Sequence, residues 1–558
     1  MRSTQTTWLM RLGRSMEAAG APLQRRAVAL AWVGVAVVAL LAAGAMAHWL
    51  LAPPQTPGVV QRLPGADHAP DPGARGISTL LVPTTDLRGR FSAGQGTAST
   101  TITSAWPLFR GSNHDGISTE QVPLVRTLSA GTLKNLWTVE MGQGYGGPAV
   151  RDGRVYVLDH DKTAFDENEL GVLLIARAAL FGFQPESTGA WPLALASAAH
   201  PGGGNGADVL RCLSLDDGRE IWRRAYSVNV APNHGITRTV PAVTQKYVVS
   251  LGPKCHVICC DAITGEFVWG LDLVNQYRSK WPAWYAGQCP LIDGDRVIIA
   301  PGGDALMIAV ELSTGKVLWT TPNPRKWEMT HASIVPMTFA GRRMYLYAGN
   351  RGVVGVSAED GSVLWETDPG VKRGKRGAIP PESTYWQVST ATVPTPVPCG
   401  DGRMFLCGGY GAGSMMLQLT EQNGQIVPKC LFRLPSRVFG SEQQTPVFYD
   451  GFLYGVRSDD SRLVCLDLNG RERWNSGNAR FDKAYGPYLI ADGMLILVNV
   501  DSTLTLAEVS PASYRPLGSA QIWEDGHETW APLALVSGRL LVRDLDRMTM
   551  IDLRKEQP

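Results

Sequence analysis

The sequence predicts an all-β fold, an eight-bladed β-propeller closed by an N-terminal strand and preceded by one transmembrane helix. Three observations carry the propeller prediction. Gly accounts for 61 and Trp for 17 of the 558 residues, and 18% are charged, which favours short strands joined by tight turns. A Gly followed four residues later by a Trp recurs about every 50 residues, and a strand–turn–strand phrase precedes each copy. Because one such unit cannot bury both faces alone, the units are expected to stack radially.

The Gly–Trp phrase is expected to place a tight turn before the last strand of a blade. The Gly supplies a conformation that other residues avoid, and the Trp is expected to fill space between neighbouring sheets. The copies are LRCLSLDDGREIW (210–222), VICCDAITGEFVW (257–269), MIAVELSTGKVLW (307–319), VVGVSAEDGSVLW (353–365) and LVCLDLNGRERW (463–474). A degenerate copy without the Trp, MMLQLTEQNGQIV, lies at 415–427. The predicted structural tryptophans are Trp137, Trp222, Trp269, Trp319, Trp365 and Trp474.

The strand–turn–strand phrase occurs eight times, which sets the number of blades. Its copies are PAVRDGRVYVL, PAVTQKYVVSL, PLIDGDRVIIA, VPMTFAGRRMYLY, TPVPCGDGRMFLC, TPVFYDGFLYGV, PYLIADGMLILV and PLALVSGRLLVR. The eighth unit ends in MTMIDLRKEQP just after its third strand, whereas Leu136–Val139 has the pattern of a fourth strand without a unit of its own. Placing this segment in the last blade closes the ring and removes two exposed sheet edges.

The N-terminal region has a different composition from the repeats. Residues 1–26 hold five arginines and one glutamate, and the 21 residues 27–47 hold no charge and no Pro. A helix of that length spans roughly 31 Å, about one hydrocarbon core. We therefore expect a cytoplasmic basic tail at 1–26 and a transmembrane anchor at 27–51. A signal peptide cleaved after Ala45-Met46-Ala47 is the alternative.

The anchor is followed by a segment rich in Pro, Gly, Ser and Thr. Residues 52–104 contain seven prolines and little apolar periodicity, so we predict a disordered linker there. The propeller is then expected over 105–558, with an insertion at 160–207.

Composition and motifs exclude several functions. The net charge is only +2, so nucleic acid is not expected as a partner. The sequence has no P-loop, no G-x-S-x-G and no H-E-x-x-H, the motifs of common catalytic sites. Cys255-His256 with Cys259 lacks a second ligand pair for zinc. We therefore predict no catalytic residue and no metal ligand.

The longest connections are predicted to gather on one face of the ring. Turns between first and second strands, such as Asp152-Gly153, share a face with those between third and fourth strands and are short. The opposite face takes the connections 160–207, 270–287, 320–330 and 366–390. Long ordered loops on one side usually carry function, although each aromatic there could instead cap a blade interface. The residues predicted to form a ligand- or partner-binding mouth are Tyr145, Arg238, Trp284, Gln288, His331, Trp386, Gln443, Tyr485 and Trp530.

One copy of the repeat, Asp261-Ala262-Ile263-Thr264-Gly265 followed by Trp269, has the pattern D-A-x-T-G-x-x-x-W. It resembles the tryptophan-docking repeat of the pyrroloquinoline-quinone (PQQ) propeller superfamily, over about 131–558. That superfamily includes quinoprotein alcohol dehydrogenases and BamB-type assembly factors of the outer membrane. The phrases WPLFRGSNHDGIS (106–118), GGYGAGSMM (408–416) and WAPLAL (530–535) resemble membrane-anchored bacterial members with PQQ-like repeats.

The resemblance leaves an enzyme as an alternative. A quinoprotein of this superfamily would need PQQ, a Ca²⁺ bound through Glu and Asn side chains, an Asp base and a vicinal disulfide against the quinone. Cys259-Cys260 is the only adjacent cysteine pair, but its register in the repeat places both side chains in strand packing, on opposite faces. No C-x-x-C-H haem-attachment motif is present.

The sequence therefore predicts a non-catalytic, membrane-tethered scaffold that binds a protein partner or small ligand at the long-loop face. The resemblance implies architecture similar to BamB-type factors, with no cofactor. The expected location is the inner membrane, with the N-terminus cytoplasmic and the propeller periplasmic. The alternative function is a PQQ-dependent oxidoreductase with Ca²⁺.

Overall fold

The computed structural model describes residues 85–129, 131, 133–162, 206–231, 234–368, 383–386, 389–482 and 485–555. These residues belong to the second of two compact units, Pro64–Pro558. The predicted basic tail, the predicted anchor at 27–51, residues 52–84 of the predicted linker and residues 163–205 of the insertion lie outside the described residues. Within the described ranges, no helix has the length and apolar character needed to cross a membrane.

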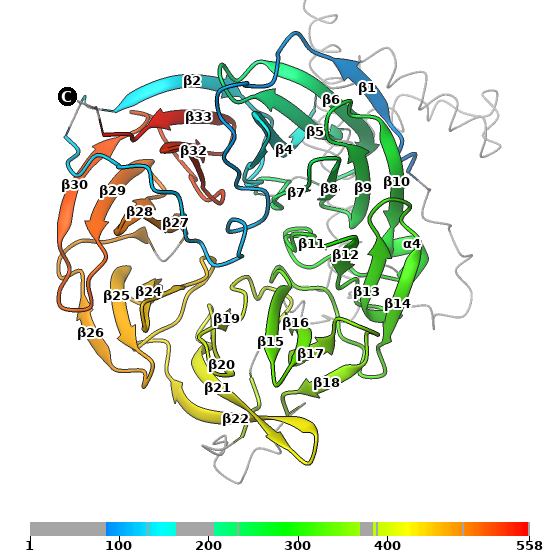
Figure 1. The fold of residues 1–558 in the computed structure, drawn as a ribbon, viewed down its shortest axis with the longest axis vertical. Coiled ribbons are helices and arrows are strands. Elements are labelled where there is room, and N and C mark those ends of the chain that lie inside the picture. The colour runs from blue at the N-terminus through cyan, green and yellow to red at the C-terminus, as the bar shows by residue number, and fades with distance from the viewer. Residues whose placement is uncertain are drawn as a thin grey trace, which may run out of the picture. The chain divides into compact units, whose positions relative to one another are not determined.

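The described strands form eight antiparallel sheets arranged around a common centre, as Figure 1 shows. The prediction of an all-β, eight-bladed propeller is confirmed. Within each blade the strands follow chain order from the inner to the outer edge, except that β2 is the outer strand of blade 8.

Blade 1 is β3 (Ala149–Arg151), β4 (Arg154–Asp161), β5 (Gly206–Ser214) and β6 (Glu220–Val228), with β1 (Arg90–Ala93) outside β6. Blade 2 is β7 (Ala242–Val243), β8 (Tyr247–Leu251), β9 (His256–Asp261) and β10 (Phe267–Asp272), followed by α4 (Leu273–Tyr277). Blade 3 is β11 (Leu291–Asp293), β12 (Arg296–Ile299), β13 (Ala305–Glu311) and β14 (Val317–Pro322). Blade 4 is β15 (Val335–Phe339), β16 (Arg342–Gly349), β17 (Gly352–Ser357) and β18 (Val363–Glu366). Blade 5 is β19 (Val397–Pro398), β20 (Arg403–Gly408), β21 (Gly413–Gln422) and β22 (Gln425–Leu434). Blade 6 is β23 (Val447–Tyr449), β24 (Phe452–Arg457), β25 (Arg462–Asp467) and β26 (Glu472–Asn475). Blade 7 is β27 (Tyr488–Ala491), β28 (Met494–Val498), β29 (Thr503–Glu508) and β30 (Pro516–Gln521). Blade 8 is β31 (Ala534–Val536), β32 (Arg539–Arg543), β33 (Arg547–Asp552) and β2 (Lys134–Glu140).

The ring is closed by β2, as the sequence predicts. This strand pairs antiparallel with β33, from Lys134 opposite Asp552 to Glu140 opposite Arg547. Trp137 is buried, and its indole Nε1 donates to the carbonyl oxygen of Leu215 in blade 1, 3.1 Å away. One strand from the N-terminal part therefore completes the last blade and contacts the first.

The tryptophans of the repeat connect each blade to the next. Trp222 donates its Nε1 to the carbonyl oxygen of Ala262 at 3.2 Å, and Trp269 donates to that of Leu312 at 2.8 Å. The turn glycine of the next blade lies against the indole: Gly265 has φ +72°, and a Cβ there would come within 2.6 Å of Trp222. Gly is required at this turn both by the backbone conformation and by the close approach of the ring.

Blades 3, 4, 5 and 7 depart from this pattern. Blade 7 has no tryptophan in its outer strand β30, and in blade 4 the Nε1 of Trp365 donates to the Sδ of Met344 in the same blade, 3.3 Å away. The Nε1 of Trp319 has no partner among the described residues, and the carbonyl oxygen of Ala358, at the position equivalent to Ala262, accepts from Arg296 at 2.7 Å. In blade 5, whose copy of the repeat lacks the Trp, Phe432 occupies that role and lies 2.6 Å from the position of a Cβ on Gly470. The β21–β22 hairpin is longer than its counterparts, so the substitute lies beyond the expected spacing.

Residues 85–104 differ from the predicted linker. Strand β1 pairs antiparallel with β6, with Arg90 opposite Ala225 and Ala93 opposite Trp222. Ile102 is buried in the core. The pairing uses backbone groups, so a segment rich in Gly and Ser can form an edge strand. For the same reason the strand leaves little trace in the pattern of apolar residues and was not predicted.

The next segment, residues 106–118, crosses the centre of the ring (Figure 1). Trp106 pairs with Val150 of β3 through two backbone hydrogen bonds of 2.9 Å. Arg110 then donates to the carbonyl oxygens of Thr445 and Pro446 beside β23, and Ser118 N donates to Ile490 O in β27. The segment thus joins blades 1, 6 and 7 across the channel.

The same N-terminal region lies on the face of the short turns. Ser104 Oγ is 2.6 Å from Ser537 Oγ in the β31–β32 turn, and Leu124 N donates to Asp492 in the β27–β28 turn. The channel is therefore covered on that face, and access is left to the face of the long loops.

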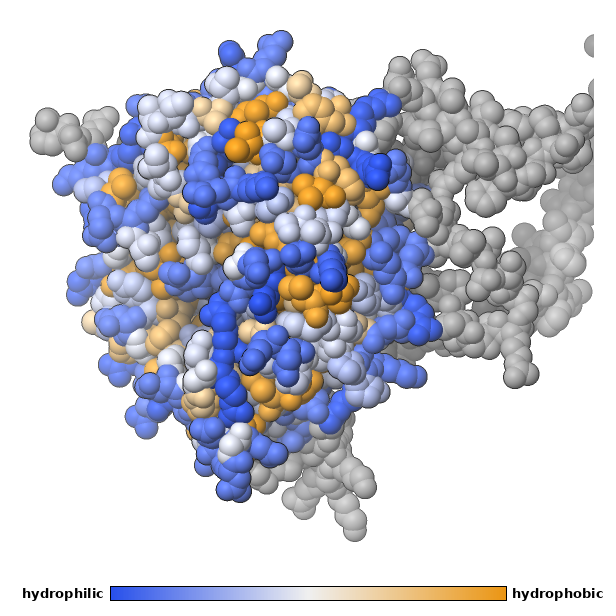
Figure 2. Space-filling view, turned by 45° about the vertical axis from the view of Figure 1, so that its right-hand side comes forward, coloured by the Kyte–Doolittle hydropathy of each residue, from blue (hydrophilic) through white to orange (hydrophobic). Residues whose placement is uncertain are grey.

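The outer surface is mixed in character. Figure 2 shows small apolar patches scattered among polar side chains on the visible face. The large apolar side chains exposed among the described residues are Phe91, Ile263, Val317, Leu318, Val363, Tyr410 and Leu431.

A buried arginine holds the seam between the first and last blades. Arg543 of β32 is 0% exposed and forms a 2.9 Å ion pair with Asp159 of β4. Its guanidinium also donates to the carbonyl oxygens of Gly142, Gly146 and Leu158, at 2.9 to 3.2 Å. Burial lowers the pKa of Arg543, and Asp159 opposes that shift.

We predict that Arg543→Met destabilises the propeller strongly. The change leaves the Asp159 carboxylate buried without this partner, and removing one member of a buried ion pair costs about 3–5 kcal/mol. Urea denaturation of the purified protein measures the effect. The control is Arg515→Met, which removes an exposed pair with Glu508 and is expected to cost less than about 1 kcal/mol. Equal midpoints for the two variants would contradict a structural role for the seam.

Candidate functional site

A cavity of about 130 Å³ lies at the centre of the ring. The segments that precede the inner strands supply one part of its lining, and the crossing segment 106–118, the β20–β21 turn and the inner strand β27 supply the rest. The lining residues are Trp106, Phe109, Arg110, Gly116, Tyr145, Arg238, Trp284, Gly287, Cys289, His331, Val393, Tyr410, Gln443, Gln444, Thr445, Pro487, Tyr488, Leu489, Trp530, Pro532 and Leu533.

The structure brings most of the predicted mouth residues together. The six that line the cavity are Tyr145, Arg238, Trp284, His331, Gln443 and Trp530. Tyr485 lies next to them, with its ring centroid 5.3 Å from that of Trp530. The six lining residues come from six different connections between blades. Each connection leads into an inner strand, which is why the six side chains converge at the channel.

Two predicted residues lie elsewhere. Gln288 is fully buried and bonds both backbone groups of Ala300, accepting from its N–H at 2.8 Å and donating to its carbonyl at 3.3 Å. Trp386 is 3% exposed and packs in the core between blades 4 and 5. Both stand in the predicted loops, but their side chains point into the protein body rather than into the cavity.

Two groups of lining residues were missed from the sequence. Trp106, Phe109 and Arg110 come from the crossing segment, and Tyr410 comes from the turn between β20 and β21. The available signals were the phrase WPLFRG at 106–111 and the Gly-rich phrase GGYGAG at 408–413. Tyr410 is 62% exposed with φ +54°, in a turn flanked by glycines.

Aromatic rings form the walls of the cavity. Tyr145 and Trp530 lie with ring centroids 4.6 Å apart. Trp284 stacks on His331 and on Tyr410, and its ring centroid lies 6.3 Å from the centroid of each of these rings. The Nε1 of Trp530 is buried and has no partner among the described residues. The walls therefore favour a planar or apolar group, with a hydrogen-bond donor left free.

Arg238 carries one of the two positive charges in the described lining. Its Nε donates to the carbonyl oxygen of Trp284, and its guanidinium lies over the Tyr145 ring, 5.2 Å from the centroid. Its Nη2 is buried and has no partner in the described part of the chain. Burial lowers the pKa of Arg238 to about 10, so the side chain stays protonated at neutral pH. Tyr145 in turn donates its hydroxyl to Glu528 at 2.8 Å.

His331 is a neutral member of the site. Its side chain is 6% exposed, and its Nε2 is buried without a partner in the described ranges. Burial lowers the pKa of His331 to about 3, and the charge of Arg238 adds to the shift. The imidazole is therefore uncharged at physiological pH and offers a polar atom, not a second cation.

No activated nucleophile is found in the lining. Cys289 contributes the thiol of the cavity, and burial raises its pKa to about 11. A thiol, rather than a thiolate, is present at neutral pH, and the thiol is a poor nucleophile.

We predict that His331 makes the protein less stable in acid. The pKa of His331 is about 6.5 in the unfolded chain and about 3 in the folded protein. Below pH 6.5 the unfolded chain takes up a proton that the folded chain does not, so stability is lost as pH falls towards 3. Between pH 6.5 and 5 the loss is about 2 kcal/mol.

The test is the pH dependence of the Tm. His331→Gln should flatten the decrease of Tm between pH 7 and 5, whereas His527→Gln, at an exposed position, should leave it unchanged. The same decrease in the wild type and in His331→Gln would show that the His331 side chain is not held neutral.

The fold is that of an eight-bladed β-propeller in which tryptophans of the repeat dock one blade onto the next. A family model described as outer membrane protein assembly factor BamB matches residues 206–476. Over these residues the chain is similar to this family of PQQ-like β-propellers. No curated protein sequence matches the chain.

Solved structures with a similar fold share little sequence with the chain. BamB from Moraxella catarrhalis is 13% identical, with 62% of this chain and 94% of that chain covered and a TM-score of 0.42. Quinohemoprotein alcohol dehydrogenase from Comamonas testosteroni is 14% identical, with 81% of each chain covered and a TM-score of 0.38. A computationally designed protein is 11% identical, with 75% of this chain and 99% of that chain covered and a TM-score of 0.44.

The residues present do not fit PQQ with Ca²⁺. The cavity of about 130 Å³ is well below the roughly 300–1,000 Å³ of sites for larger ligands, and PQQ is a fused three-ring tricarboxylate. No Asp or Glu occurs in the described lining, so carboxylate ligands for Ca²⁺ are lacking there. Cys259 and Cys260 are free, fully buried thiols in β9 that pack in different interblade cores. They lie outside the lining of the cavity.

Proposed function

We propose that this protein is a non-catalytic binding scaffold, tethered to the inner membrane, whose periplasmic propeller recognises a protein partner or small ligand at the central cavity. The observation that carries the proposal is the set of buried polar atoms without described partners, on Arg238, His331 and Trp530, around one cavity. Buried polar groups are normally hydrogen-bonded. Atoms left free in a cavity are therefore available to a ligand.

The site should be reachable from the long-loop face. Tyr410 is the most exposed large apolar side chain described, and it lines the cavity. A photo-crosslinking amino acid at position 410 is therefore expected to capture the partner in intact cells. The matched control is position 263, where Ile263 is 53% exposed in the β9–β10 turn on the opposite face.

The crosslinking result has a specific signature. The product formed from position 410 should disappear when Arg238→Met is added, because the free guanidinium is lost, and position 263 should give no such product. Identical products from both positions, or a product indifferent to Arg238→Met, would count against the cavity as the binding site.

The tether forms a separate part of the proposal. It rests on the 21 uncharged residues 27–47 and the arginines before them. We predict that the mature chain keeps residues 27–51 and is extracted from membranes only by detergent. Mass spectrometry of the native N-terminus checks this, and a mature chain starting at His48 would show a cleaved signal peptide instead.

A further inference from the structure

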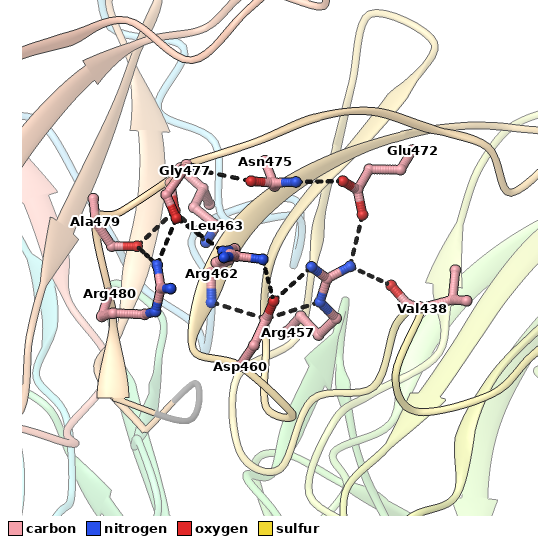
Figure 3. A network of polar contacts seen from close by, with 11 residues as sticks. Val438, Arg457, Asp460, Arg462, Leu463, Glu472, Asn475, Gly477, Ala479 and Arg480 are labelled. Atoms are coloured by element: carbon pink, nitrogen blue, oxygen red, sulfur yellow. Dashed lines mark hydrogen bonds and ion pairs between the residues drawn. The ribbon is translucent and has the colours of Figure 1, made fainter.

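The arginines of the propeller differ in how their charge is balanced. Figure 3 shows Arg457 of β24, whose Nε and Nη2 each lie 2.8 Å from the oxygens of Asp460, while its Nη1 lies 2.6 Å from Glu472. Hydrogen bonding to Asp460 raises the pKa of Arg457. Arg543 is likewise paired, with Asp159. In both cases the protein supplies a carboxylate to a guanidinium that is almost fully buried.

Arg238 has no such carboxylate in the described residues. Its one described acceptor is the carbonyl oxygen of Trp284. Glu528 lies near enough to raise its pKa, but Glu528 accepts the hydroxyl of Tyr145 and does not line the cavity. Arg238 is partly buried, with its Nη2 removed from water and without a described partner. Withdrawing a cation from water costs free energy unless it is paired, so the guanidinium is stabilised best when a ligand supplies the anion.

A second arginine reinforces the positive potential. Arg110 lines the same cavity, and its described hydrogen bonds go to carbonyl oxygens of His114, Asp115, Thr445 and Pro446. The side chain of Asp115 offsets part of this charge but does not line the cavity. Two arginines and no acid occur among the described lining residues. The nearby carboxylates of Asp115, Glu442 and Glu528 act on lining residues but lie outside that lining.

We infer that the cavity binds the carboxylate of a small, planar or apolar acid, held by Arg238 and the indole N–H of Trp530. This inference rests on the proposed function of the same site and specifies its ligand. A carboxylate accepts from a guanidinium and further donors at once. The neutral His331 adds a polar atom without changing the charge.

The size and the walls limit the body of the acid. The cavity of about 130 Å³ is slightly smaller than the roughly 150 Å³ that accommodates benzene. A phenyl-sized body therefore fills it, and a ligand that carries a carboxylate as well extends towards the exposed Tyr410 at the long-loop face. The rings of Tyr145, Trp284 and Trp530 suit a single planar group. The ligand class is therefore one carboxylate on a body about the size of a phenyl ring, from a free acid or from the C-terminus of a polypeptide.

The experiment is calorimetric titration of the full-length, detergent-solubilised protein with sodium benzoate and with neutral benzamide. Benzoate should bind at least tenfold more tightly than benzamide. Its affinity should be constant from pH 5.5 to 8.5, because Arg238 stays charged and His331 stays neutral over that range. Equal affinities, no benzoate binding, or tighter binding of inorganic phosphate would overturn the inference.

Variants identify the cation. Arg238→Met should weaken benzoate at least tenfold and leave benzamide unchanged, and Arg238→Lys should recover part of the loss. Arg462→Met removes one positive charge on blade 6 outside the lining and should not alter binding. Thermal melting confirms that each variant is folded. Unchanged benzoate affinity in a folded Arg238→Met protein would overturn the assignment.

A peptide arm distinguishes the two sources of the carboxylate. Displacement of benzoate by a peptide ending in Phe with a free carboxylate, but not by its amide, identifies a polypeptide terminus. Displacement by neither identifies a free acid. If no carboxylate binds while the crosslink at position 410 still requires Arg238, the inference fails and the proposed scaffold function stands.

Discussion

The structure depends on the pairing of β2 with β33. A propeller buries its blades against each other, so an open ring would expose two blade faces at once. Here the pairing is reinforced from inside by Arg543, which holds the carbonyl oxygens of Gly142 and Gly146 on either side of Tyr145. The contacts that close the ring therefore also position Tyr145 in the wall of the cavity. The site cannot keep its geometry if the seam opens.

Buried charge is used in two ways in this molecule. Arg543 and Arg457 form ion pairs with acids of the protein. Arg543 pairs with Asp159, which is far away in the chain, whereas Arg457 pairs with the nearby Asp460 and Glu472. Arg238 is only partly buried, and the described protein gives it a single carbonyl oxygen as acceptor. The first pattern stabilises a fold, whereas the second leaves an interaction to be completed by something else.

The sequence predicted the blade count because each repeat carries the same turn glycine and the same indole. It predicted for a topological reason that side chains of these loops converge, since every connection that enters an inner strand ends at the channel; a binding role for them stays a prediction. It did not predict side-chain direction. Gln288 satisfies a backbone N–H and carbonyl at Ala300, and Trp386 joins a core, because these contacts depend on tertiary packing.

Two further features left little signal in the sequence. Strand β1 is held by backbone hydrogen bonds along the edge of β6, and a Gly- and Ser-rich composition hides such pairing. Phe432 takes the place of a tryptophan only because the β21–β22 hairpin is extended. Arg110 reaches the cavity from a segment that precedes the repeats and follows no repeat pattern.

The crossing segment and β2 also bear on how the chain folds. During synthesis these residues emerge before any blade exists, yet Trp137 contacts Thr549, 412 residues further on. Contacts of such long range slow folding, and the early segment must wait, unpaired, until β33 has emerged. Until then the blades already made form an open arc with an exposed apolar face and unpaired strand edges at its ends. Such a state is prone to aggregation. A chain of this topology places an unusual demand on chaperones that hold nascent or exported polypeptides.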